Sequence, residues 1–132
     1  MNQIIRPFRE KDFTRIVELI EAENWSNLVS KQAEYREALL QSNPVLVATV
    51  EDKIVGYIRA ITDQHISLYI CELLVDPAYR KYGIGKELMN QAHALFPTTR
   101  VELLATSTSQ TYYEQQNYQP FYGFRRAPKE MK

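Results

Sequence analysis

The chain has 132 residues, and its sixteen basic side chains balance sixteen acidic ones to give a formal net charge of zero. That length predicts one domain spanning residues 1–132, and the zero net charge disfavours a nucleic-acid partner held by bulk charge. A single cysteine, Cys71, excludes an internal disulfide and is typical of a reducing compartment. Because no apolar run approaches the about 18 residues of a membrane span and the N-terminus lacks a signal-peptide pattern, we expect a cytoplasmic protein with no membrane partner.

The first forty residues predict one strand and two helices. Residues 2–8 are the strand candidate. Asp12 is the expected N-cap of a helix reaching about Asn24, since apolar residues then recur at helical spacing. Ser30 is expected to cap a second helix with a weaker apolar face, which Pro44 ends.

The hydrophobic period then changes to that of strands. Residues 45–50 and 54–60 are β-branched runs on either side of a short turn and predict a hairpin. Residues 66–75 are nearly all apolar except Ser67 and Glu72, as in a central strand covered on both faces. Asp76-Pro77 ends that strand, because proline offers no backbone donor.

A glycine-containing turn leads into the last part of the chain. It predicts a helix ending before Pro97, a strand over 101–105, a short polar helix over 107–116 and an aromatic-rich closing strand over 118–125. The element order is β-αα-β-β-β-α-β-α-β. This is an α/β pattern with one strand–turn–helix–strand crossover between residues 66 and 105.

The turn Arg80–Gly85 (RKYGIG) predicts an anion site. A helix beginning at about Gly83 leaves its first N–H groups unpaired, and its dipole places positive charge there. Glycines allow phosphate oxygens to approach the backbone, and Arg80, Lys81 and Lys86 add charge. The alternative is a tight strand-to-helix turn with solvated basic residues.

Two nucleotide motifs fit this turn poorly. The dinucleotide fingerprint requires a third glycine, which is missing, and Glu102 lies early in its expected strand rather than at the carboxyl end where a ribose-binding acid belongs. The nucleotide P-loop requires an earlier glycine and a Ser or Thr after Lys86, where Glu87 stands.

A family resemblance narrows the choice. Residues 75–89 (VDPAYRKYGIGKELM) resemble the central motif of the GNAT superfamily of acyl-CoA N-acyltransferases, Gln/Arg-x-x-Gly-x-Gly/Ala opening a helix after a strand and an Asp-Pro turn. Residues 112–118 (YYEQQNY) resemble the second family signature, Phe-Tyr-Glu-x-x-Gly-Phe, with Asn117 in place of glycine and Tyr118 in place of phenylalanine. Asparagine tolerates left-handed geometry, so we expect the helix end to survive.

The resemblance implies a fold and a donor. The fold would be a single-domain GNAT-like α/β structure with a mixed central sheet of about six to seven strands flanked by about four helices. The donor would be acetyl-CoA, without a metal. The backbones of Leu73 and Val75 would bond to pantetheine, and one of their N–H groups would polarise the thioester carbonyl. The remaining coenzyme-binding set would be Arg80, Lys81, Tyr82, Gly83, Ile84, Gly85, Lys86 and Ser107.

The resemblance also suggests catalytic residues. Tyr113 aligns with the family tyrosine that protonates the departing thiolate, and a phenol with a pKa near 10 stays protonated at neutral pH. The acceptor amine must lose a proton, and Glu72 and Glu102 are the candidates for a base, with Glu72 also a candidate substrate anchor. Deprotonation through water stays open. Cys71 is expected to be a small buried residue rather than a nucleophile.

The function expected is an N-acetyltransferase that moves an acetyl group to a primary amine of a small molecule or peptide, by direct attack in a ternary complex. Trp25, Tyr35 and Asp63 would suit a small cationic amine on composition alone. The alternative is a non-catalytic acetyl-CoA-binding sensor or interaction module of the same fold. Transfer of a longer acyl group, and a homodimer paired through the closing strands, stay open.

Overall fold

The computed structural model describes residues 2–105 and 109–128 and divides into two compact units, residues 1–102 and 103–132. The first unit begins with the strand β1 (Gln3–Pro7), a 3-10 turn (Glu10–Asp12) and the helices α1 (Phe13–Ala22), α2 (Ser26–Ser30) and α3 (Gln32–Gln41). It continues with β2 (Val45–Val50), β3 (Lys53–Thr62), β4 (Ser67–Val75), a second 3-10 turn (Pro77–Tyr79) and α4 (Ile84–Leu95). The boundary between the two units falls within β5 (Arg100–Leu103), and the second unit contains α5 (Gln110–Gln115).

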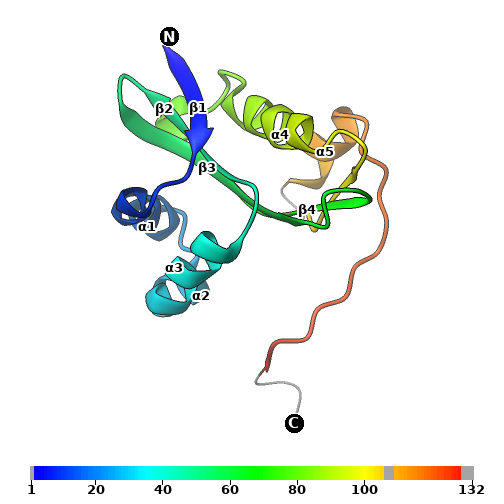
Figure 1. Ribbon diagram of the computed structural model, residues 1–132, viewed down its shortest axis with the longest axis horizontal. Helices are drawn as coiled ribbons and strands as arrows, with labels where there is room; N and C mark the ends of the chain where they lie inside the picture. Colours follow the sequence, from blue (N-terminus) through cyan, green and yellow to red (C-terminus); the bar gives the residue numbers. More distant parts are fainter. Residues whose placement is uncertain (1, 106–108, 129–132) are drawn as a thin grey trace. The chain divides into compact units, whose positions relative to one another are not determined.

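The five strands form one sheet in the order β1-β2-β3-β4-β5. The first three neighbouring pairs are antiparallel. The crossover through α4 returns the chain in the direction of β4, so β5 runs parallel to β4 and the sheet is mixed. In the first unit, α1, α2 and α3 cover one face of the sheet and α4 covers the other (Figure 1). The predicted α/β, GNAT-like fold is confirmed.

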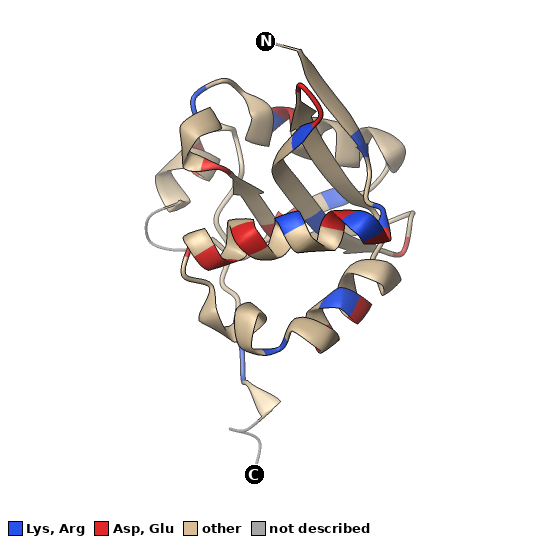
Figure 2. Cartoon of the chain, turned by 90° about the vertical axis from the view of Figure 1, so that its left-hand side faces the viewer, with Lys and Arg blue, Asp and Glu red and all other residues tan. Residues whose placement is uncertain are grey.

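The core of the first unit follows from the sequence pattern. α1 buries its apolar face, Ile16, Val17, Leu19 and Ile20, against the sheet. All six residues of β2 are buried, as expected for an inner strand. On the face of the molecule drawn in Figure 2, acidic and basic residues are interspersed along the helices, in keeping with the balanced composition. Within the described residues, no helix is both long and apolar enough to span a membrane.

Two expectations about helix starts need correction. Asp12 does precede α1, but its carboxylate makes no cap bond to that helix; it accepts from the Arg6 guanidinium at 2.8 and 2.9 Å and from the Arg9 N–H at 2.7 Å. Ser30 caps no helix. It ends α2, and its hydroxyl donates to the Asn27 carbonyl, while Lys31 leaves helical geometry and separates α2 from α3. The short helix α2, which was not expected, makes five α-helices rather than four in the described residues.

The expected closing strand is also wrong. Residues 118–127 belong to no helix or strand, so the described part of the chain has five strands rather than six to seven. Aromatic residues favour strands only when neighbouring strands are available to pack against them, and Pro120 offers no backbone donor. This segment therefore has the composition of a strand, but composition alone does not provide the neighbouring strand that pairing requires.

A β-bulge interrupts the pairing of β3 with β4. Arg59 faces Glu72, but the next residue of β3, Ala60, faces Ile70, so Cys71 is the extra residue on β4. An extra residue on one strand turns neighbouring side chains toward the same face. The bulge therefore sets where the side chains of Cys71 and Glu72 point.

Candidate active site

The turn after β4 has the geometry that an anion site needs. The Asp76 carboxylate accepts from the Ala78 N–H at 3.0 Å, and Pro77–Tyr79 form a single 3-10 turn. Lys81 (φ 74°) and Gly83 (φ 80°) then take left-handed backbone conformations. A Cβ on Gly83 would meet no atom within 4 Å, so the turn is open toward solvent at this residue.

The first turn of α4 presents unpaired donors. The Glu87 N–H bonds to the Gly83 carbonyl at 3.0 Å. Because this is the first bond of the helical ladder, the N–H groups of Ile84, Gly85 and Lys86 precede it, have no acceptor within the helix and are the donors that an anion would meet at this helix end. The side chains of Lys81 and Lys86 are exposed beside them. Backbone donors, helix dipole and side-chain charge therefore act at one place.

Arg80 has a different role from the two lysines. Its Nε donates to the Val75 carbonyl at 2.9 Å, and its Nη2 pairs with Glu23 at 2.8 Å. The side chain thus ties the turn to the last residue of β4 and to the residue that follows α1. This guanidinium shapes the turn, and the nearby charge available to a ligand comes from Lys81 and Lys86.

The edge of β4 beside the turn carries the two predicted pantetheine residues. The Asp76 N–H bonds to the Val55 carbonyl at 2.7 Å. Hydrogen-bonded pairs alternate along an antiparallel ladder, so Leu73 and Val75, which face Ile58 and Gly56, are non-hydrogen-bonded pairs. Their backbone N–H and carbonyl groups therefore point away from β3.

The neighbour on that side, β5, is short. Its first residue, Arg100, donates its N–H to the Ile66 carbonyl just before β4 begins. Four residues of parallel strand from there pair only with the first half of β4. The backbone of Leu73 and Val75 thus lies past the segment that β5 pairs with.

Two glycines set how closely α4 approaches this strand. A Cβ on Gly56 would lie 3.0 Å from the Leu74 carbonyl oxygen and 3.5 Å from Leu88 of α4. A Cβ on Gly85 would meet Val75 and Leu73 only at ordinary contact distances, 3.7 and 3.8 Å. The first turn of α4 thus packs on the side chains of Leu73 and Val75.

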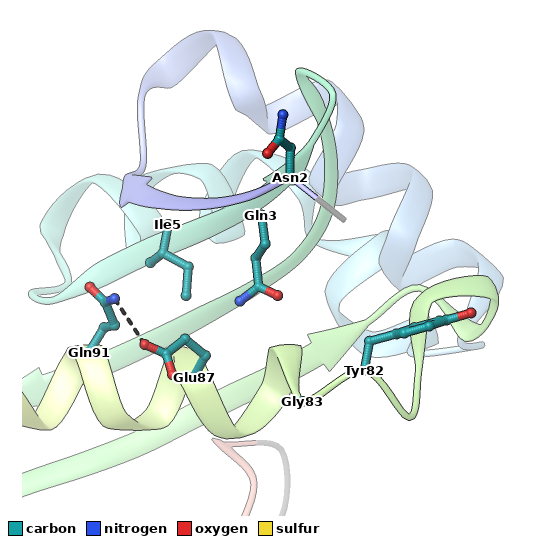
Figure 3. Close-up of a pocket in the computed structure, with 7 residues that line it drawn as sticks. All are labelled: Asn2, Gln3, Ile5, Tyr82, Gly83, Glu87 and Gln91. Atoms are coloured by element: carbon teal, nitrogen blue, oxygen red, sulfur yellow. Dashed lines mark hydrogen bonds between the residues drawn. The ribbon is translucent and has the colours of Figure 1, made fainter.

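An open cavity of about 450 Å³ lies between β1 and α4 (Figure 3). Gln3 and Ile5 reach toward the helix, from which Gln91 donates to Glu87 at 3.0 Å. The cavity shares Tyr82, which is 61% exposed, and Gly83 with the turn, and its other lining residue is Asn2. Its lining contains amides and one carboxylate but no lysine or arginine, so it suits a phosphate less well than the turn does.

Glu72 belongs to a polar cluster on the face of the sheet covered by α1, α2 and α3. Its carboxylate is held by Arg59, with Nε–Oε1 and Nη2–Oε2 distances of 2.6 Å each, and the Tyr35 hydroxyl donates to Oε1 at 2.6 Å. The Tyr35 and Tyr57 oxygens are 2.7 Å apart, and Arg59 Nη1 donates to the Ser42 hydroxyl at 3.1 Å. This cluster spans α3, β3 and β4.

Burial and charge shift the titrations in this cluster. Burial is the main cause that raises the pKa of both Tyr35 and Tyr57, and the nearby Glu72 charge raises each further. Burial acts to lower the pKa of Arg59, but its bonds and attraction to Glu72 outweigh that and raise it. Burial also raises the pKa of the Cys71 thiol, so it stays protonated and is not a prepared nucleophile.

Glu102 lies elsewhere. It is the second-to-last residue of β5, and the side chain that pairs with it is Arg100, at 3.3 Å. The expectation that it sits early in its strand is wrong. The dinucleotide reading fails on a firmer ground, since the strand before the glycine turn pairs antiparallel with β3 rather than lying in a parallel nucleotide-binding sheet.

Tyr113 lies on α5 in the second unit. Its ring packs edge-on against Tyr112 and Tyr118, with centroids 5.1 and 5.5 Å away. Burial, with smaller contributions from those two tyrosines, raises the pKa of Tyr113 to about 12. Asn117 takes a left-handed conformation (φ 69°) and the Tyr118 N–H bonds back to the Tyr113 carbonyl, so the helix end survives as expected. Ser107 lies outside the described residues.

The residues expected to bind the acceptor lie in different structural environments. Trp25 is partly buried and packs on the core, and Tyr35 is buried with its hydroxyl on Glu72. Asp63 accepts the N–H groups of His65, Ile66 and Ser67, which lower its pKa to about 2, so it shapes a loop. No group of three or more His, Cys, Asp or Glu side chains in residues 2–105 and 109–128 could hold a metal ion.

Sequence reasoning missed Arg59. A signal was present, because Arg59 and Glu72 are the single charges of the predicted runs 54–60 and 66–75, and buried charges require partners. Tyr35 was considered only as an aromatic residue on the acceptor side. The strand pattern does not indicate that this helix residue reaches the Glu72 carboxylate.

Comparisons with known proteins point to one family and one fold. Residues 8–130 match the family model of the acetyltransferase (GNAT) domain. A GNAT-family acetyltransferase from Streptococcus pneumoniae superposes with a TM-score of 0.79 at 23% identity, over 98% of each chain. A GCN5-related N-acetyltransferase from Ralstonia eutropha (TM-score 0.75, 23% identity, 96% of this chain and 98% of that one) and an acetyltransferase from Trypanosoma brucei (0.68, 19%, 96% and 99%) share the fold. No curated protein sequence matches significantly.

Proposed function

This chain belongs to the GNAT acetyltransferase family, and we propose that it transfers an acetyl group from acetyl-CoA to a primary amine of a small molecule or peptide. The observation that carries the proposal is the turn from Arg80 to Lys86, where backbone donors of α4 and two exposed lysines lie at the end of a strand whose outer backbone is available. Such a turn suits phosphate oxygens, and the family implies that these belong to the diphosphate of acetyl-CoA.

The donor would lie along β4. The N–H groups from Arg80 to Lys86 would hold the diphosphate, and the backbones of Leu73 and Val75 would bond to pantetheine as an added strand does. Their orientation away from β3 supports this assignment. A backbone N–H of Leu73 or Val75 would also polarise the thioester carbonyl and stabilise the oxyanion that forms on it.

The reaction is direct transfer in a ternary complex. The neutral amine nitrogen attacks the thioester carbon, the carbon–sulfur bond breaks, and the coenzyme leaves as a thiolate. Tyr113 protonates that thiolate, a role supported by a pKa of about 12, which keeps the phenol protonated at neutral pH. The proton of the amine leaves through water or through one of two carboxylates, Glu72 and Glu102.

Release of free thiol from acetyl-CoA tests the proposal. A panel of primary amines, including putrescine, tyramine and a glycyl peptide, should accelerate thiol release, and mass spectrometry should find the acetylated amine. Tight acetyl-CoA binding with no release for any amine, and no change on Tyr113→Phe, would instead support a non-catalytic acetyl-CoA-binding module.

A further inference from the structure

The arrangement of Arg59 and Glu72 assigns a specific role to a carboxylate beside the β4 edge. The two side chains face each other across β3 and β4, immediately next to the bulge at Cys71. They are 17% and 11% exposed, so the pair is neither a surface ion pair nor fully sealed from solvent. Arg59 therefore balances the charge of Glu72 at a partly exposed position.

The hydrogen bonds leave one acceptor position open. An ionised carboxylate offers about four acceptor positions, two on each oxygen. Oε1 accepts from Tyr35 and from Arg59 Nε, so both of its positions are used. Oε2 accepts from Arg59 Nη2, and no other side chain or N–H among the described residues donates to it. Glu72 thus has one remaining acceptor position, on Oε2.

The phenols form a chain of donors directed at this carboxylate. Tyr35 donates its proton to Glu72, so in the contact between the two phenols Tyr57 donates to Tyr35. Burial raises the pKa of both phenols, so both keep their protons. An added donor at the open position of Oε2 would displace none of these donors. The arrangement therefore leaves Glu72 able to accept an N–H group while it keeps its present donors.

The location fits an acceptor amine. Glu72 immediately precedes Leu73, whose backbone points to the edge where the thioester would lie. The side chain of Glu72 projects onto the face covered by α1, α2 and α3, while the side chain of Leu73 lies on the α4 face, 3.8 Å from where a Cβ on Gly85 would be. An amine held at Oε2 would thus be one residue from the proposed donor edge, on the face opposite α4.

We propose that Glu72 is the anchor that binds the acceptor's amine at Oε2, and that Tyr35 and Arg59 are positioning residues that hold this carboxylate in place. This inference rests on the proposed function and deepens it. The substrate class is a primary amine that keeps an N–H directed at Glu72 while its lone pair faces the thioester. Deprotonation then falls to water or to Glu102.

Binding measurements on the CoA-saturated protein test the anchor. The probes are amine and alcohol pairs of equal shape: tyramine with 4-(2-hydroxyethyl)phenol, and putrescine with 1,4-butanediol. In the pair that binds more tightly, wild type should bind the amine with higher affinity than the alcohol. Glu72→Gln should lower the affinity for that amine by about 10- to 100-fold and change the affinity for the alcohol little. Failure of both amines to bind wild type, or equal weakening of amine and alcohol, would overturn the anchor.

Tyr35→Phe and Tyr57→Phe form a matched pair. Each removes one buried hydroxyl, but only the Tyr35 hydroxyl touches Glu72. Tyr35→Phe should weaken amine binding by about 3- to 10-fold, and Tyr57→Phe by less than about 2-fold. Tyr35→Phe keeps the Arg59–Glu72 ion pair. It therefore tests whether Glu72 binds the amine even if Glu72→Gln fails to fold. Equal effects of the two variants would mean that Tyr35 only packs and would contradict its positioning role.

Steady-state kinetics separate the two proposals. With Glu72 as anchor, Glu72→Gln raises KM for the amine and leaves kcat and the affinity for acetyl-CoA nearly unchanged. A large loss of kcat at unchanged KM would make Glu72 the base, overturning the anchor while the proposed function stands. Amine binding as predicted, with no thiol release from wild type, would overturn the proposed function and leave the anchor in place.

Discussion

A Cβ on Gly56 would lie 3.0 Å from the carbonyl oxygen of Leu74 on the neighbouring strand. That oxygen is backbone and cannot move aside cheaply. β3 and β4 hold the Arg59–Glu72 pair and the β4 edge, so this spacing matters to the whole candidate site.

We expect Gly56→Ala to lower the free energy of unfolding by about 1–3 kcal/mol, because the methyl group would force the two strands apart. Gly85→Ala is the matched control. Its Cβ would make only ordinary contacts with Val75 and Leu73, so its stability should stay within about 1 kcal/mol of wild type. Chemical denaturation of both variants measures the difference, and equal stabilities would show that the spacing at Gly56 imposes no constraint.

Arg80 should act through the shape of the turn. Arg80→Ala removes the bonds to Val75 and Glu23, and we expect about 3- to 10-fold weaker acetyl-CoA binding by calorimetry. Arg80→Gln can still donate to the Val75 carbonyl, so its affinity should stay within about 2-fold of wild type. Equal losses in the two variants would mean that the charge at this position, rather than its bond to β4, supports binding.

Tyr113 and Tyr112 provide an internal comparison for the acid. Tyr113→Phe should lower kcat by about 100-fold or more, while Tyr112→Phe, which removes a neighbouring and more exposed hydroxyl, should leave kcat within about 3-fold. Thiol-release kinetics with the best amine measure both effects. Similar kcat values for the two variants would argue against an acid role for Tyr113.

The pH dependence of the reaction gives a separate test of Tyr113. Its pKa of about 12 lies above that of an ordinary phenol, so the acid stays protonated through pH 10. The rate should therefore show no falling limb from this group between pH 7 and 10. A limb centred near pH 10 that disappears in Tyr113→Phe would contradict the shifted titration.

Asp12 should make stability depend on acid pH. Burial acts to raise its pKa, but bonds from Arg6 and the Arg9 N–H, with the charge of Arg6, lower it below the ordinary 3.8. A lowered pKa stabilises the fold above about pH 4, and this contribution is lost as the pH falls through the folded-state value. Asp12→Asn should therefore lower the free energy of unfolding by about 1.5–3 kcal/mol at pH 7, and by progressively less below pH 4. A difference in the free energy of unfolding between the variant and wild type that does not change with pH would refute this account.

The sequence predicted most of the fold for identifiable reasons. The run from Val45 to Val50 and the run ending at Asp76-Pro77 carry strong β signals and a clear stop, and both strands formed as expected. The short helix α2 forms just before the expected second helix, and residues 118–127 form no strand. Both outcomes depend on tertiary partners that local patterns do not encode.

The candidate site was predictable where it depends on backbone. The sequence predicted that a helix begins at about Gly83, and α4 does begin directly after Gly83, which takes a left-handed conformation. The environment of Glu72 depends on a bulge at Cys71 and on a tyrosine 37 residues away, Tyr35, and neither leaves a local signature. Side-chain clusters assembled across α3, β3 and β4 therefore required the structure.

A crystal structure with acetyl-CoA tests the central claim most directly. We predict that the diphosphate oxygens lie about 2.7–3.2 Å from backbone nitrogens between Arg80 and Lys86, with pantetheine bonded to the backbone of Leu73 and Val75. A diphosphate bound in the cavity between β1 and α4, or a pantetheine arm that does not contact β4, would contradict the account.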